Sequence, residues 1–283
     1  MGAVARLLPD GERLHLQHGP IDLIIGAEGA RDAAFAAARA RFETVLDELV
    51  AELPLLRRAV GDVLAGTVAR RMAAAVRPHG AQFVTPMAAV AGAVAEEVLA
   101  AMVAAAPLSR AYVNNGGDIA FYLSQGTRFR MAVAGLDGLA LGRIDVGFAD
   151  AARGVATSGW GGRSFSLGIA DAVTVLARTA AEADVAATMI CNAVDLPGHV
   201  AVARAPADSL QPDSDLGARL VTVAVGALRE AEVAEALSRG VAVAEDICGR
   251  GLALSAALFL QGQARMVGQA ALSFIPDRSL CDA

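Results

Sequence analysis

Residues 154–195 constrain the fold most, because they join short apolar runs to glycine-dense turns and then to an alanine-rich segment. The apolar runs at 154–157 and 170–177 predict β-strands, since they are short and rich in Val, Thr and Leu. The segment 180–194 is longer and predicts an α-helix. Strand, turn, strand and helix in this order indicate a mixed α+β fold in the middle of the chain.

The rest of the chain extends this α+β pattern on both sides. Predicted strands cover 12–16, 21–25, 111–113, 119–123, 128–133, 139–146, 220–225 and 252–260, and predicted helices cover 31–50, 63–76, 86–106 and 231–248. Residues 206–212 indicate a surface loop, 261–271 have no assignment, and 276–283 are expected to form a loose tail. A helix-then-strands order recurs around the middle, which suggests two related halves within one domain of 283 residues, with a boundary near 115–150.

Composition excludes several classes of protein. All 24 basic residues are arginine, so mechanisms that need a lysine base or a lysine Schiff base are excluded. The net charge of −6 and the aromatic content of 4% argue against nucleic acid as a partner. The three cysteines match no zinc spacing, and we expect reduced thiols.

The sequence also carries expectations about location. No apolar run of a signal peptide is present near residue 1, and Glu96-Glu97 interrupt the most apolar segment, 86–106. We therefore expect a cytoplasmic protein that is not inserted in a membrane. A homodimer is compatible with a chain that is 55% hydrophobic.

Two glycine-rich turns are candidate ligand sites. The segment Asn115-Gly116-Gly117-Asp118 is typical of a β-hairpin, and its amides and its Asn115 and Asp118 side chains are alternatively suited to a ligand. In the second turn, Gly159-Trp160-Gly161-Gly162 can bend around an anion. Arg163, Ser158 and Ser164 are hydrogen-bond donors near the same place.

The helix at 180–194 places Asp184 and Thr188 on one face, four residues apart. A carboxylate and a hydroxyl in this arrangement can share one Mg²⁺ ion. The alternative is a threonine bonded within its own helix beside a solvated aspartate. The helix at 86–106 begins with Thr85 and Pro86, and its small residues either admit a phosphate at the helix start or pack closely on a sheet. His79 is interpreted as a plain loop residue.

Together these motifs resemble the ApbE superfamily of flavin transferases. The resemblance is carried, in order, by Asn115 to Asp118, Ala156 to Gly159, and Ala183-Asp184 with Thr188. The run Ser164 to Val173 is similar to the hallmark Ser-Phe-Ser-x-Gly-x-Ala-Asp-Ala-Val of a shorter branch of that superfamily. The resemblance covers most of the chain, from the first predicted helices to beyond residue 195.

The resemblance implies a T-fold-related α+β fold of two similar halves with a flavin nucleotide in the cleft between them. It implies that FAD and Mg²⁺ are bound and that FMN is transferred to a hydroxyl of a protein acceptor. Asp184 and Thr188 would be Mg²⁺ ligands, with the backbone carbonyl of Ala91 as a third. The nucleotide would lie against Asn115, Gly116, Gly117 and Asp118, and Thr157, Ser158 and Gly159 would line its pocket, with Ser164 close by.

Two departures from the superfamily pattern leave the chemistry open. The transferases carry a lysine where this chain has Gly92, and a His-Ile-x-Asp-Pro segment that this chain lacks. One hypothesis is a Mg²⁺-dependent enzyme, either an FMN transferase or a hydrolase of the FAD pyrophosphate, with Asp171 as general base and Arg163 steadying phosphate charge. A second is a module that binds a flavin for a partner enzyme without turnover. A third is an enzyme acting on another small anionic metabolite.

Overall fold

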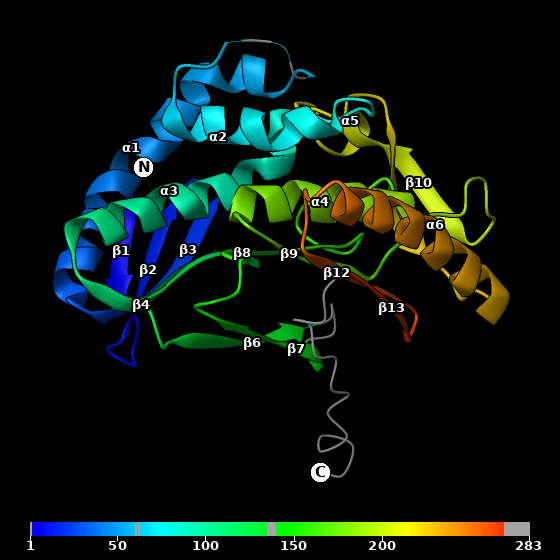
Figure 1. The fold of residues 1–283 in the computed structure, drawn as a ribbon. Helices are drawn as coiled ribbons and strands as arrows, with labels where there is room; N and C mark the ends of the chain where they lie inside the picture. The colour runs from blue at the N-terminus through cyan, green and yellow to red at the C-terminus, as the bar shows by residue number, and fades with distance from the viewer. Residues whose placement is uncertain (1, 60, 62, 135–139, 269–283) are drawn as a thin grey trace. The chain divides into compact units, whose positions relative to one another are not determined.

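A computed structural model describes residues 2–59, 61, 63–134 and 140–268 (Figure 1). It contains both helices and strands in quantity, so the fold is α+β, as the sequence predicts. Contacts divide the chain into two compact units. The first consists of Met1–Arg128, Gly147–Ala156 and Ala177–Val185, and the second of Phe129–Val146, Thr157–Leu176 and Ala186–Ala283. The similarity of two halves stays a prediction, and the expected tail at 276–283 lies outside the described residues.

The first unit is built on antiparallel strands in the order β1-β2-β3-β4-β5, with the start of β8 beside β5. Their bounds are β1 (Val4–Leu7), β2 (Arg13–His18), β3 (Ile21–Gly29), β4 (Leu108–Asn115), β5 (Asp118–Leu123) and β8 (Gly154–Ser158). Alternate side chains of β2 are buried, and Leu14 and Leu16 pair with Ile25 and Leu23 of β3. This period of two gives the sheet one apolar face that helices must cover.

Two of the three helices of the first unit supply that cover, and the other packs on them (Figure 1). The three helices are α1 (Arg31–Leu56), α2 (Thr67–Val76) and α3 (Val90–Ala105). Helices α1 and α3 pack on the strands and on each other, and α2 packs on α3. Two 3₁₀ turns, η1 (Arg77–His79) and η2 (Pro86–Ala89), precede α3. Pro86 occupies the first position of η2, as predicted, but the Thr85 side chain makes no capping bond there.

The helical segment Pro86–Ala105 is long and apolar enough to cross a membrane by length and composition alone, and it is the one such helix among the described residues. Core helices of soluble proteins meet the same test. Here the segment contacts α1, α2 and strands β4 and β5. Its Glu96 and Glu97 are ion-paired with Arg71, and Glu97 also with Arg41. These contacts account for its apolar composition by packing within the unit.

The second unit centres on two strands, β9 (Ala172–Ala177) and β12 (Ser255–Leu260), in which every residue is buried. The end of β8 lies beside β9, and β13 (Gln263–Gly268) lies beside β12. Helix α6 (Glu230–Gly249) packs on β12 and β13. Helix α4 (Ala180–Ala193) begins in the first unit and continues into the second. Two two-stranded ribbons complete the unit, β6 (Arg128–Ala134) with β7 (Ala140–Gly147), and β10 (Val202–Pro206) with β11 (Leu220–Val225).

Most predicted elements are present, and five elements or boundaries differ. Strands β1, β10 and β13 were not predicted, and residues 207–210 of the predicted loop form the short helix α5 (Ala207–Leu210). The helix expected from residue 63 begins at Thr67.

Candidate functional site

The hairpin predicted from Asn-Gly is present between β4 and β5, where Asn115 pairs with Asp118. Gly116 and Gly117 have φ angles of 66° and 113°, a region that glycine enters without steric cost. The Gly117 N–H donates to Oδ1 of Asn114 at 2.8 Å, so the turn already uses one of its two glycine amides. The hairpin interpretation is therefore confirmed, and a ligand role for its polar side chains depends on their other neighbours.

Those neighbours lie in the first turn of α3. Asn115 is 5% exposed, and its Nδ2 donates to the backbone carbonyl of Ala91 at 3.2 Å. The Asp184 carboxylate accepts the Gly92 N–H at 3.0 Å and also bonds the Ala91 N–H. The first amides of a helix lack intrahelical partners and carry partial positive charge, so a carboxylate is stabilised there. The fold thus brings Ala91, Asn115 and Asp184 together from three distant parts of the sequence.

Asp118 joins this group electrostatically. The pKa of Asp184 is raised well above its ordinary value of 3.8, first by burial and then by the nearby charge of Asp118. The Gly92 and Ala91 amides lower it but do not cancel the rise. Two carboxylates held near each other in this way are costly to ionise together. A cation beside them would reduce that cost.

The donor atoms of this group suit a hard cation. Ala91 offers a carbonyl oxygen, Asp118 and Asp184 offer carboxylates, and Thr188 lies one turn beyond Asp184 on α4 with its side chain partly exposed. Mg²⁺ prefers oxygen ligands and is commonly held by one or two carboxylates, with water and substrate phosphates completing its shell. Within the described part of the chain no cluster of three or more His, Cys, Asp or Glu side chains could hold a metal. A metal here would therefore combine these carboxylates with carbonyl, hydroxyl and external oxygens.

Gly92 is in tight contact with α4. A Cβ at this position would lie 2.3 Å from the backbone oxygen of Ala180 and 2.7 Å from the backbone nitrogen of Ala181. Backbone atoms cannot yield as the end of a flexible side chain can. The close approach of α3 and α4 therefore requires glycine here.

In the second unit, Thr157 and Ser158 at the end of β8 bond to neighbours within the fold. The hydroxyls of Thr157 and Thr174 lie 2.9 Å apart, within hydrogen-bond distance. Ser158 hydrogen-bonds the thiol of Cys191, whose pKa is raised chiefly by burial. Burial of this kind makes a cysteine unreactive.

Gly159 and Asp171 hold the loop after β8 in place. A Cβ on Gly159 would lie 2.3 Å from the Asp171 carbonyl. The Asp171 carboxylate accepts Nε1–H of Trp160 at 3.2 Å through one oxygen and the Gln261 backbone N–H at 2.6 Å through the other. Among the non-glycine residues that the structure describes, Gln261 is the one with a positive φ angle, 42°. Asp171 thus secures two turns, and both of its oxygens already accept hydrogen bonds.

The hallmark-like run from Ser164 to Val173 is largely accounted for by packing. The Ser166 hydroxyl accepts the Gly168 N–H at 3.1 Å, and Asn192 Oδ1 accepts the Leu167 N–H at 2.9 Å. A Cβ on Gly168 would lie 2.0 Å from the carbonyl oxygen of Cys191. By contrast Arg163 and Ser164, which precede the hydrogen-bonded residues 166–168, are exposed to solvent.

The predicted site residues therefore fall into two sets. Ala91, Asn115, Gly116, Gly117, Asp118 and Asp184 lie in the first unit, and Thr157, Ser158, Gly159, Arg163, Ser164, Asp171 and Thr188 lie in the second. The structure brings Ala91, Asn115 and Asp184 together at the start of α3, and the charge of Asp118 acts on Asp184. Sequence reasoning missed Glu96, whose Oε1 accepts the Ala181 N–H at 2.7 Å at the start of α4. No local motif marks this contact, because its partners are 85 positions apart.

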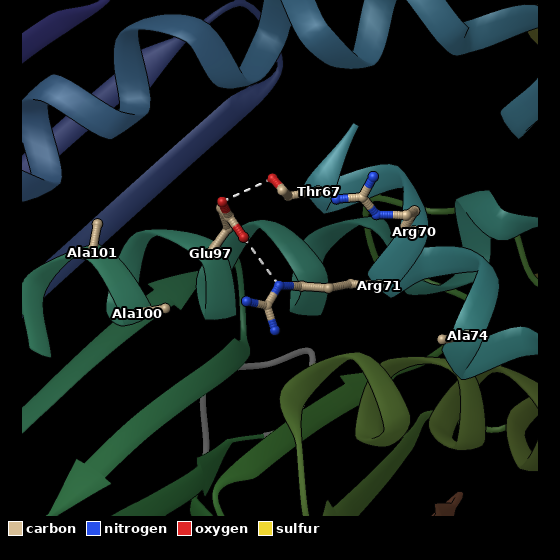
Figure 2. Close-up of a pocket in the computed structure, with 7 residues that line it drawn as sticks. All are labelled: Thr67, Arg70, Arg71, Ala74, Glu97, Ala100 and Ala101. Carbon is tan, nitrogen blue, oxygen red and sulfur yellow. Dashed lines mark hydrogen bonds and ion pairs between the residues drawn. The ribbon is translucent and has the colours of Figure 1, made fainter. Parts of the chain in front are cut away.

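A pocket with a volume of about 510 Å³ lies in the first unit between α2 and α3, and Figure 2 shows its lining. It is lined by Thr67, Arg70, Arg71, Ala74, Glu97, Ala100 and Ala101. None of the predicted site residues is among them. The Glu97 carboxylate accepts hydrogen bonds from the Thr67 hydroxyl at 2.9 Å and from Arg71 at 3.0 Å, so Arg71 balances its charge (Figure 2). The chemistry of this pocket does not suggest a ligand.

A family model described as AbpE bacteria matches residues 5–266. The chain belongs to this family. Membership of the AbpE bacteria family confirms the resemblance to the ApbE superfamily inferred from the motifs.

Two relatives are similar over part of the chain. A UPF0280 protein of Methanopyrus kandleri is 40% identical over 182 residues, which is 60% of this chain and 69% of that protein. A UPF0280 protein of Methanococcoides burtonii is 38% identical over 143 residues, which is 49% of this chain and 56% of that protein.

Two solved structures are similar at low identity. The apo flavinyl transferase ApbE of Pseudomonas stutzeri has a TM-score of 0.47 at 12% identity, covering 95% of this chain and 94% of that one. The flavin transferase ApbE from Vibrio cholerae has a TM-score of 0.40 at 14% identity, covering 92% and 98%. Both scores lie below 0.5, so these likenesses carry no conclusion about the site of this AbpE bacteria family member.

Proposed function

We propose that this chain is a Mg²⁺-dependent flavin-nucleotide-binding protein that cleaves the pyrophosphate of FAD. The observation that carries the proposal is the Asp184 carboxylate, which is held at the first turn of α3 and lies near enough to Asp118 for their charges to interact. Family membership supports the flavin, and the oxygen-only donor set supports the metal.

In this proposal Asp184, Thr188 and the Ala91 carbonyl hold Mg²⁺, which would supply positive charge to the pyrophosphate. Asn115 keeps the Ala91 carbonyl in place through its 3.2 Å hydrogen bond. Gly116, Gly117 and Asp118 lie against the nucleotide, and Thr157, Ser158, Gly159 and Ser164 contribute to the flavin pocket. Because the chain has no lysine, Arg163 is the candidate for balancing charge on the leaving phosphate.

The bond broken is the P–O bond between the FMN phosphorus and the bridging oxygen of FAD. The FMN phosphoryl group passes to water or to a serine or threonine hydroxyl of a protein acceptor, and AMP leaves with the bridging oxygen. The proton of the attacking hydroxyl needs a base, for which Asp171 is the candidate.

One observation favours a second candidate function. Both oxygens of Asp171 accept hydrogen bonds, from Trp160 and Gln261, and this chain has glycine in place of the transferase lysine. A carboxylate engaged in this way is a poor base. The alternative is therefore a module that binds FAD with Mg²⁺ and does not turn it over.

Incubation with FAD and Mg²⁺, with AMP measured by chromatography, tests both candidates. We expect AMP release that falls at least about tenfold in Asp184→Asn, because a metal ligand is lost. Asp246→Asn on α6 is the matched control, since it removes an exposed helical carboxylate paired with Arg250 and should leave release unchanged. Tight FAD binding without AMP would establish the binding module, and absence of FAD binding would overturn both candidates.

A further inference from the structure

Helices α3 and α4 each hold a first-turn backbone amide of the other helix with a carboxylate. Asp184 of α4 accepts the Gly92 N–H of α3 at 3.0 Å, and Glu96 of α3 accepts the Ala181 N–H of α4 at 2.7 Å. Between these two bonds the backbones meet at Gly92 and Ala180. Each helix therefore supplies the anion that the unpaired amides of the other helix require, and each bond is strengthened by the carboxylate charge.

Glu96 also connects this junction to α2. Its Oε2 accepts Nη1–H of Arg71 at 3.2 Å, while Nε–H of Arg71 donates to Glu97 at 3.0 Å, the second contact being drawn in Figure 2. Glu97 shares Arg71 with Glu96, but its other contacts go to Arg41 of α1 and Thr67 of α2. Glu96 and Glu97 thus share Arg71. Of these two glutamates, Glu96 is the one that contacts α4 in the described part of the chain.

We propose that Glu96 is a positioning residue for the cation site. By fixing the Ala181 amide it fixes the first turn of α4, and so holds Asp184 at the Gly92 and Ala91 amides of α3, where Asp118 affects its charge. Ala181 and Asp184 are three residues apart within one helical turn, so a displacement of the first is passed to the second. This inference rests on the proposed function and deepens it, because the site that Glu96 holds in position would bind a hard divalent cation.

The test compares three variants by two measurements. The first measurement is the Kd for Mn²⁺, obtained from the electron paramagnetic resonance signal of the free ion. The second is the hydrogen-exchange rate of the Gly92 amide, obtained by NMR. In Glu96→Ala we expect the Mn²⁺ Kd to rise at least about tenfold and the Gly92 amide to exchange faster, because Asp184 no longer holds it.

Glu96→Gln keeps an oxygen that can accept the Ala181 N–H, so we expect it to restore most of the Mn²⁺ affinity and the slow Gly92 exchange. It also decides the matter if Glu96→Ala fails to fold. Glu97→Ala is the matched control. It removes a neighbouring carboxylate with the same arginine partner, and should lower thermal stability while leaving Mn²⁺ affinity and Gly92 exchange unchanged.

Two outcomes separate this inference from the proposed function. If Glu97→Ala changes Mn²⁺ affinity and Gly92 exchange as much as Glu96→Ala does, Glu96 has only a general structural role and the inference is overturned. If the unmodified protein does not bind Mn²⁺, the proposed metal site fails. In that case the Gly92 exchange rates in the three variants still show whether Glu96 positions Asp184.

Discussion

At the scale of single residues, the environment of the Glu182 side chain conflicts with its charge. It closes a capping box with Thr179, whose hydroxyl accepts the Glu182 N–H at 3.2 Å while the carboxylate bonds the Thr179 amide. Its Oε2 is nevertheless buried and has no hydrogen-bond partner among the described residues. The pKa of Glu182 is raised, first by burial and then by the charge of Glu96.

This environment predicts that Glu182→Gln stabilises the protein at neutral pH by on the order of 0.5 kcal/mol, a small value because solvent screens a half-buried group. Glutamine keeps the capping box and removes the charge. A carboxyl group whose folded-state pKa is raised lowers stability as pH rises through that pKa. The advantage should therefore vanish below the ordinary glutamate pKa of 4.5.

Urea unfolding of both proteins from acid to neutral pH measures this difference. Glu43→Gln, at an exposed position of α1, is the control and should show no such pH-dependent gain. An equal stability difference at acid and neutral pH would contradict the assignment.

Site residues were predictable from sequence to the extent that local chemistry marks them. Asn-Gly marks the hairpin at Asn115, and the four-residue spacing marks Asp184 and Thr188. The bond from Gly92 to Asp184 joins positions 92 apart, so no local pattern indicates it. The same holds for the inward orientation of Asn115, which depends on where α3 packs. Tertiary packing, not spacing, decides these contacts.

At the scale of elements, the close approach of α3 and α4 predicts that Gly92 cannot be replaced by a residue with a side chain without loss of stability. Gly92→Ala should lower the free energy of unfolding by about 1–3 kcal/mol, because its Cβ would lie 2.3 Å from a backbone oxygen. Gly92→Lys should be at least as destabilising. Denaturant unfolding measures both.

Gly249→Ala is the matched control for this crossing. It also replaces a helical glycine, but a Cβ there meets nothing within 4 Å. Its expected effect is neutral to stabilising, by up to about 1 kcal/mol. Equal destabilisation by both alanine substitutions would refute the steric explanation.

The elements themselves were predicted where hydrophobic periodicity is strong. Strand β2 alternates apolar and polar residues, and Thr85-Pro86 marks the start of the helical segment formed by η2 and α3, so the sequence indicates both. Strand β1 was missed because all four of its residues are exposed, which leaves no buried face to produce a pattern. Strand β13 was missed for a related reason, since its residues are exposed or partly exposed and it follows the turn at Gln261-Gly262.

At the scale of the whole molecule, charge composition restricts how any anionic ligand is held. The 283 residues contain no lysine and have a net charge of −6, so no general positive field attracts a flavin nucleotide. Many arginines are already paired with carboxylates, for example Arg41 with Glu48 and Arg204 with Asp195. Positive charge for a pyrophosphate must then come from a few arginines, from helix amides and from a metal.

This restriction predicts that FAD binding is sensitive to arginine reagents and insensitive to amine reagents. Phenylglyoxal should abolish binding, and saturating FAD should protect against it, whereas an amine-acylating reagent has no lysine to attack and should leave the Kd unchanged. Arg163→Ala should weaken FAD binding about tenfold, as expected for loss of one charged hydrogen bond. Arg239→Ala on α6, an exposed arginine paired with Glu235, is the control and should have no effect. If arginine modification leaves FAD affinity intact, the pyrophosphate is held by the metal and helix amides alone, and the role assigned to Arg163 is wrong.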